Sequence, residues 1–211
     1  MPPSGDDFRE LCVFNLQPCR YVHSSWLETL AHGELTQRLC QHPRVSSPLN
    51  RYLLNRFGLL GDYCFALEGY ARSVAVLPTE KLARLVRLAG LVQHSQQLRQ
   101  VISAQEVAHV RAQLGESDYQ FTLNRAPFVI SPANLPRLDL PRDDLPRHCD
   151  RVGMYYLSAS LHQQPVAVMN RVLLKLHYEL AADADAVPPS ITPALATLLM
   201  SKLKKIVCSS P

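Results

Sequence analysis

The residues in this chain that are best suited to chemistry form two short clusters, Cys40-Gln41-His42 and His148-Cys149-Asp150. A histidine next to a thiol can serve as the base for a cysteine nucleophile, and both side chains bind zinc. A zinc site needs four ligands that converge on one point, whereas adjacent residues on a regular element point in different directions. Neither cluster predicts a metal site, and a catalytic Cys/His pair assembled from distant residues stays an open alternative.

The cysteines as a whole do not have the spacing of a disulfide-bonded or metal-binding protein either. The six residues Cys12, Cys19, Cys40, Cys64, Cys149 and Cys208 have irregular spacings and no Cys-x-x-Cys pair. The start Met1-Pro2-Pro3-Ser4 has neither the basic nor the apolar segment of an export signal, so we expect reduced thiols that are buried or idle. Phosphate-binding loops, nucleophile elbows, zinc-protease helices and dinucleotide-binding turns do not occur in the sequence. We therefore expect no catalytic residue, no cofactor and no metal.

Composition and charge distribution narrow the possible classes of protein further. The 211 residues are 47% hydrophobic and 19% charged, which is typical of a globular protein. A net charge of +4 with one tryptophan is weak for a nucleic-acid binder, which concentrates basic and aromatic residues together. The longest run without charged residues, 152–170, contains His162, Gln163, Gln164 and Pro165 near its middle, so we expect no transmembrane segment.

The elements that must position any site are helices. Apolar spacing, capping residues and prolines predict a mainly α fold, a compact bundle of short and medium helices with little or no strand. The expected helices cover about 21–30, 48–57, 79–94, 104–114, 117–125, 146–162, 165–180 and 193–207. Ser47, the Ser103–Glu106 capping box and Thr192 provide N-terminal caps. The stretch 79–94 is apolar over more than half of its circumference, which predicts a central helix.

The predicted domain organisation is a disordered tail at 1–7 followed by a single helical domain at 8–211. Prolines at 127, 132, 136, 141 and 146 exclude a continuous helix, so we expect an apolar, extended strap over 126–147. The segment 181–191 is expected to be an exposed connector. His94 is interpreted as a polar residue that complements the C-terminal end of its helix.

Two basic clusters are the candidate partner-binding residues. The first is Lys81, Arg84 and Arg87 on the central helix, and the second is Lys202, Lys204 and Lys205 on the last helix. Lys202 falls within the apolar stripe of Leu195, Leu198, Leu199, Leu203 and Ile206. Either its stem lies along the edge of the core, or the final turns of the helix bind an acidic partner surface.

Four blocks of the sequence resemble a known family. These are Phe14–His23, Leu49–Phe57 with Asp62 and Tyr63, Leu88–His94, and Leu199–Ile206. In order and spacing they are similar to the K component of bacterial type III secretion systems, the SctK family, and within it to the YscK/PscK branch. The similarity is weakest over about 125–190, and it carries no catalytic residues.

The resemblance implies a helical adaptor of the sorting platform, the assembly beneath the injectisome. Its partners would be the cytoplasmic forkhead-type domain of the inner-membrane ring protein (SctD) and the C-ring-like pod protein (SctQ), which leads on to the ATPase complex. The implied location is the cytoplasm, at the cytoplasmic face of the inner membrane. The alternatives are a type III secretion chaperone, a class typically built as small, acidic α/β dimers, and an enzyme with unrecognised Cys/His chemistry.

Overall fold

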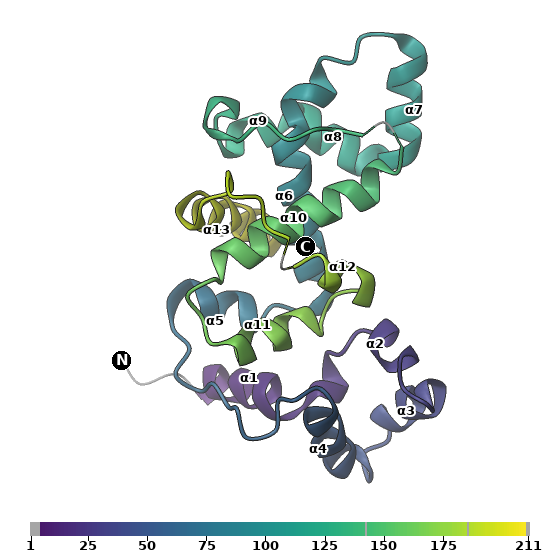
Figure 1. The fold of residues 1–211 in the computed structure, drawn as a ribbon, viewed down its shortest axis with the longest axis vertical. Helices are drawn as coiled ribbons and strands as arrows, with labels where there is room; N and C mark the ends of the chain where they lie inside the picture. Colours follow the sequence, from purple (N-terminus) through teal and green to yellow (C-terminus); the bar gives the residue numbers. More distant parts are fainter. Residues whose placement is uncertain (1–4, 142, 185, 210–211) are drawn as a thin grey trace. The chain divides into compact units, whose positions relative to one another are not determined.

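Helices account for all of the regular secondary structure in the described part of the chain (Figure 1). A computed structural model describes residues 5–141, 143–184 and 186–209, with side chains from residue 8 onwards. These ranges contain thirteen α-helices, two short 3₁₀ helices and no strand. The predicted mainly α fold is confirmed.

The chain forms two compact units, and each is discontinuous in sequence. Unit 1 comprises residues 1–82 and 163–182, and unit 2 comprises residues 83–162 and 183–211. The sequence patterns predicted one helical domain and did not indicate this division, because the return of the chain at residue 163 carries no local signal. That the two units behave as one domain stays a prediction.

Unit 1 is built mainly from the N-terminal third of the chain. It contains α1 (Gly5–Leu16), η1 (Pro18–Arg20), α2 (Ser24–Glu28), α3 (Gly33–Cys40), α4 (Ser46–Arg56), α5 (Gly69–Ala75), α11 (Val166–Leu173) and α12 (Tyr178–Ala182). Helix α4 packs on α1, η1 and α3, while α11 packs on α5. One apolar cluster joins Tyr21, Leu54, Leu59 and Leu174, so the late helices complete a core that the early ones begin.

A buried arginine fixes the loop that follows α4. Arg171 is fully buried and donates from Nη2 to the carbonyl oxygen of Leu59 at 3.1 Å and from Nη1 to that of Ala167 at 3.1 Å. Gly58, in the left-handed region at φ 66°, ends α4 and starts this loop. The loop therefore has a fixed base, and the residues after it line the groove described below.

Unit 2 contains the central helix α6 (Thr79–Arg99), which begins at the end of unit 1. The others are α7 (Ala104–Leu114), α8 (Glu116–Asn124), α9 (Ala126–Val129), η2 (Pro132–Asn134), α10 (Leu145–Ser160) and α13 (Pro193–Ser209). Helix α10 packs along α13 and against α7. Leu82, Leu85, Val86, Ala89 and Val92 of α6 are all buried, which confirms that the helix is central.

Several helix starts follow the predicted caps. The hydroxyl of Ser103 accepts the backbone N–H of Glu106 at 3.1 Å, and that of Thr192 accepts the N–H of Leu195 at 3.4 Å. Helix α4 starts two residues before the predicted position, with Val45 rather than Ser47 as its N-cap residue. The hydroxyl of Ser46, the first residue of the helix, donates to the Pro43 carbonyl at 3.0 Å and closes the preceding turn.

Two of the expected helices are shortened or interrupted. The segment 21–30 is helical only over Ser24–Glu28, and Gly33, expected to follow a helix, begins α3. A Cβ at Gly33 would clash with the Leu27 carbonyl group, so the glycine permits the two helices to approach closely. The expected helix 165–180 breaks between α11 and α12, where Lys175 and Leu176 are buried in unit 1.

The tail, strap and connector differ in part from the predictions. Residues 1–4 lie outside the described residues, while 5–7 belong to α1 rather than to a disordered tail. The strap begins later than expected, because Pro127 occupies the first turn of α9, where its missing N–H costs nothing. The connector is less exposed than expected, since Ala184 and Ile191 are buried.

Candidate functional site

The His148-Cys149-Asp150 cluster is dispersed by the helix that carries it. His148 Nε2 lies 3.0 Å from His94 Nε2, whereas Asp150 accepts two hydrogen bonds from Arg87 at 2.5 and 2.6 Å. Cys149 is fully buried, and burial raises its pKa to about 12. A thiol with a raised pKa is the opposite of an activated nucleophile. The cluster therefore has no catalytic geometry.

His94 is a core residue rather than the polar residue of a helix end. Helix α6 continues for five residues beyond it, to Arg99, and the side chain is fully buried. Its Nδ1 lies 2.7 Å from the Gln97 amide oxygen, and burial lowers its pKa to about 4. The imidazole is therefore neutral at pH 7 and joins α6 to α10 through His148.

The first basic cluster forms salt bridges within unit 2. The Arg84 guanidinium pairs with Asp118, and Arg87 pairs with both Asp118 and Asp150. Asp118 is 7% exposed, so these arginines compensate a buried carboxylate between α6, α8 and α10. Lys81, half-buried, lies on the part of α6 that belongs to unit 1. The structure thus gives Arg84 and Arg87 a role in stability, and partner binding by this cluster stays a prediction.

The second basic cluster lies beside exposed apolar side chains. The buried stripe of α13 is Ala196, Leu199, Met200, Leu203 and Val207, so Lys202 lies outside it. Lys202 is exposed and donates from Nζ to the Val129 carbonyl at 2.9 Å. Lys204 is half-buried and Lys205 is exposed. The expected conflict between Lys202 and an apolar stripe does not exist, because the stripe is rotated away from Leu198.

Phe128 is the centre of this surface. Its side chain is 86% exposed at the end of α9, and with Arg125, Val129, Lys202 and Ile206 it lines a shallow cavity of about 480 Å³. Leu198, 51% exposed, lies one helical turn before Lys202 on the same face of α13. We call Arg125, Phe128, Leu198, Lys202 and Ile206 the Phe128 surface. The sequence placed Phe128 in the strap but gave no signal that it faces solvent.

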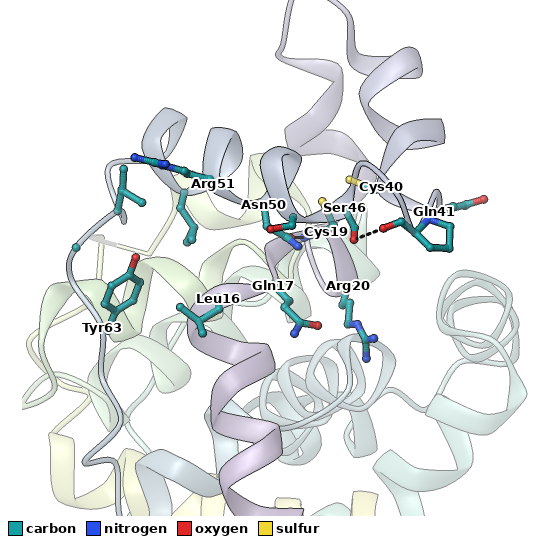
Figure 2. Close-up of a pocket in the computed structure, with 15 residues that line it drawn as sticks. Leu16, Gln17, Cys19, Arg20, Cys40, Gln41, Ser46, Asn50, Arg51 and Tyr63 are labelled. Atoms are coloured by element: carbon teal, nitrogen blue, oxygen red, sulfur yellow. Dashed lines mark hydrogen bonds between the residues drawn. The ribbon is translucent and has the colours of Figure 1, made fainter.

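Unit 1 has a larger groove between η1, the end of α3, α4 and the loop after α4 (Figure 2). Its volume is about 880 Å³, and its charged lining residues, Arg20 and Arg51, are both cationic. Three exposed apolar side chains, Leu16, Leu60 and Tyr63, lie along it. We call this the unit 1 groove. It is suited to a partner segment that combines carboxylates with apolar side chains.

Two cysteines share the wall of this groove. Cys19 of η1 and Cys40 at the end of α3 both line it, and Figure 2 shows their sulfur atoms next to one another. The Cys19 backbone N–H donates to Asn50 Oδ1 at 2.9 Å, which holds η1 on α4. Irregular spacing in the sequence gave no indication of this pair. Within the described ranges, no group of three or more His, Cys, Asp or Glu side chains is arranged to hold a metal.

The chain matches one protein family over nearly all of its length. Residues 11–210 match the family model of YOP proteins translocation protein K (YscK). The chain belongs to the YscK family. This confirms the resemblance to the SctK family and makes the YscK-family chain a component of type III secretion. Neither the curated proteins nor the solved structures contain a significant match. Of the helices in the described ranges, none has the length and apolarity to cross a membrane.

Proposed function

We propose that this YscK-family protein is a non-enzymatic adaptor of the type III secretion sorting platform. It would link the cytoplasmic domain of the inner-membrane ring protein (SctD) to the C-ring-like pod protein (SctQ), and through the latter to the ATPase complex. The family match over residues 11–210 supports a place in the secretion apparatus. Such an adaptor works in the cytoplasm and is recruited to the cytoplasmic face of the inner membrane.

The observation that carries the adaptor role is that each unit has its own exposed apolar surface. Unit 1 presents Leu16, Leu60 and Tyr63 along its groove, and unit 2 presents Phe128 and Leu198. Large apolar side chains in solvent, flanked by cationic ones, are characteristic of protein-binding surfaces. Because an adaptor must contact two neighbours, two such surfaces on separate units meet its minimum requirement.

The alternatives fit the structure less well. A secretion chaperone of the α/β class needs a sheet, and the described residues form helices without a strand. An enzyme with Cys/His chemistry needs a thiol that a histidine activates. Cys149 is buried with a raised pKa, and the adjacent His148 pairs with His94.

Co-purification tests the proposal. The full chain is expressed with the cytoplasmic domain of SctD and, separately, with SctQ, and each mixture is passed over affinity and size-exclusion columns. We expect a stable complex with each neighbour and a ternary complex when all three are present. Binding to neither neighbour would overturn the adaptor role.

The predicted basic residues are tested in the same assay. Charge reversal of the second cluster, Lys202, Lys204 and Lys205, to Glu should weaken one of the two complexes if this cluster binds an acidic face. Arg84 and Arg87 are less suitable for charge reversal, because their replacement removes the salt bridges to Asp118 and Asp150. For that cluster Lys81→Glu is the informative variant, since no salt bridge to its side chain is described.

A further inference from the structure

The thiols of Cys19 and Cys40 lie next to one another in the wall of the unit 1 groove (Figure 2), although 21 positions separate them in the chain. Cys19 belongs to η1, and Cys40 is the last residue of α3. Both elements pack on α4, and Asn50 of α4 accepts the backbone N–H of Cys19. The pair is therefore held by three elements of unit 1 rather than by a flexible loop.

The pair is also accessible. Both cysteines are partly exposed and line the unit 1 groove, which is open to solvent and large enough for a small-molecule reagent. Cys149, by contrast, is fully buried. The pair therefore combines access from solvent, two neighbouring sulfur atoms and two arginines, Arg20 and Arg51, in the same lining.

We propose that Cys19 and Cys40 form a thiol–disulfide exchange site whose co-substrate is a small disulfide of the glutathione type. The site is independent of the adaptor role, because it requires neither protein partner. Formation of the bond needs the two sulfur atoms to approach to about 2.05 Å. It would join η1 to the end of α3 across the wall of the groove.

The two thiols have different roles. The hydrogen bond from Cys19 stabilises the thiolate of Cys40 and lowers its pKa, whereas the same bond, together with burial, raises the pKa of Cys19. Cys40 is thus the attacking thiol, since the thiolate is the reactive form. Its Sγ attacks one sulfur of glutathione disulfide, forms a mixed disulfide and expels one glutathione thiolate.

Cys19 then completes the exchange. Its thiol loses a proton, its Sγ attacks Sγ of Cys40, and the second glutathione thiolate leaves. The two protons of the protein thiols are taken up by the two glutathione molecules, and two electrons pass from the protein to the glutathione disulfide. The products are one intramolecular disulfide and two molecules of reduced glutathione.

The test uses the full chain with Cys12, Cys64 and Cys208 replaced by serine, which leaves Cys19, Cys40 and the buried Cys149. The protein is equilibrated with glutathione disulfide, and its intact mass and tryptic peptides are measured. We expect a mass lower by two hydrogen atoms, with peptides 10–20 and 39–44 joined until dithiothreitol is added. Two thiols that stay reduced, or that each carry a glutathione without becoming joined, would overturn the proposal.

A second variant tests the order of the steps. Adding Cys19→Ser to this background removes the thiol that resolves the mixed disulfide, so glutathione should remain on Cys40 and increase the mass by one adduct. Cys40→Ser should react more slowly at the remaining Cys19. If this second variant forms its adduct as fast as the first, Cys40 is not the attacking thiol. Circular dichroism of each reduced variant controls for folding. If a variant does not fold, the mass measurement on the protein that retains both Cys19 and Cys40 decides the proposal.

Discussion

Lys175 is a cationic residue buried in unit 1. It is 4% exposed, and its ammonium group donates to the carbonyl oxygens of Ala75 at 2.5 Å and Leu77 at 2.8 Å. The same nitrogen lies 5.5 Å from the ring centre of Phe14 and 5.4 Å from that of Tyr21. Lysine thus satisfies carbonyl groups at and beyond the end of α5, as a cation can at a helix C-terminus.

The buried ammonium should make stability depend on pH. Burial lowers the pKa of Lys175 from 10.5 to about 8, and Glu10 opposes the shift. Between these values the unfolded chain holds the proton and the folded chain has released it, so unfolding free energy rises with pH. From about pH 7 to about pH 9.5 the gain is on the order of 2 kcal/mol.

Denaturant unfolding of the wild type and of Lys175→Met at both pH values measures this effect. The rise in unfolding free energy between the two pH values should be about 2 kcal/mol smaller in Lys175→Met than in the wild type, because methionine keeps the aliphatic length and cannot titrate. Lys205→Met, at an exposed position, should keep the wild-type pH dependence. An equal pH dependence in wild type and Lys175→Met would show that the ammonium is not buried as described.

Residue-scale prediction from sequence worked where the signal is local. The caps at Ser103 and Thr192 were predicted because each needs only a side chain and a backbone N–H three residues away. The burial of Arg171 and Lys175 was not, since their acceptors at Leu59, Ala75 and Leu77 lie about a hundred residues earlier. The Cys19–Cys40 pair was also missed, because these residues lie on two different elements, η1 and α3, and only the tertiary structure brings them together.

At the scale of elements, α6 and α10 meet through two glycines. A Cβ at Gly153 would clash with the carbonyl group of Val86, and one at Gly90 with that of Cys149. The helices approach closely only because these side chains are absent. The sequence contains both glycines but gives no reason to pair them.

Gly153→Ala has two opposing effects on the unfolding free energy. Helix propensity alone favours alanine by about 1 kcal/mol. The clash with the Val86 carbonyl requires the helices to move apart, which costs about 1–3 kcal/mol or more in overpacked cores. We expect the clash to dominate and the unfolding free energy to fall, measured by chemical denaturation. Gln96→Ala, at an exposed position on α6, is the control and should be near neutral; a stabilised Gly153→Ala would contradict the close approach.

The strap is held to α6 by two glutamines. The side-chain amide of Gln93 donates to the Pro136 carbonyl at 2.6 Å, and that of Gln97 donates to the Leu138 carbonyl at 2.9 Å. Between Leu135 and Pro141 the strap has no regular secondary structure. Prolines therefore predicted its irregular backbone correctly, but not its attachment to α6 by side chains.

Gln97→Ala should release the strap locally. One hydrogen bond contributes about 0.5–1.5 kcal/mol, so opening around Arg137 should become roughly two- to tenfold more frequent. Limited trypsin digestion under native conditions reports this as faster cleavage after Arg137. Gln96→Ala is again the matched control, and equal cleavage rates in the two variants would show that the amide does not hold the strap.

At the scale of the whole molecule, the division into two units suggests that binding is divided as well. Tyr63 is 42% exposed on the unit 1 groove, and Phe128 is 86% exposed on unit 2. Neither ring is needed to fill a core, so replacing it should leave folding intact. The sequence predicted helices, a family and two basic clusters, but not the exposed aromatic side chains, because exposure depends on the tertiary arrangement.

Tyr63→Asp and Phe128→Asp should therefore each weaken binding to a different neighbour. An aromatic anchor at the centre of an interface contributes about 2 kcal/mol or more, so the affected complex should lose at least about tenfold in affinity. The other complex should be unchanged, as measured by calorimetry with the SctD cytoplasmic domain and with SctQ. Ile102→Asp, at a position 89% exposed and outside both surfaces, is the control. If either variant weakens both complexes equally, or if neither variant weakens any, the two surfaces are not the separate contacts of an adaptor.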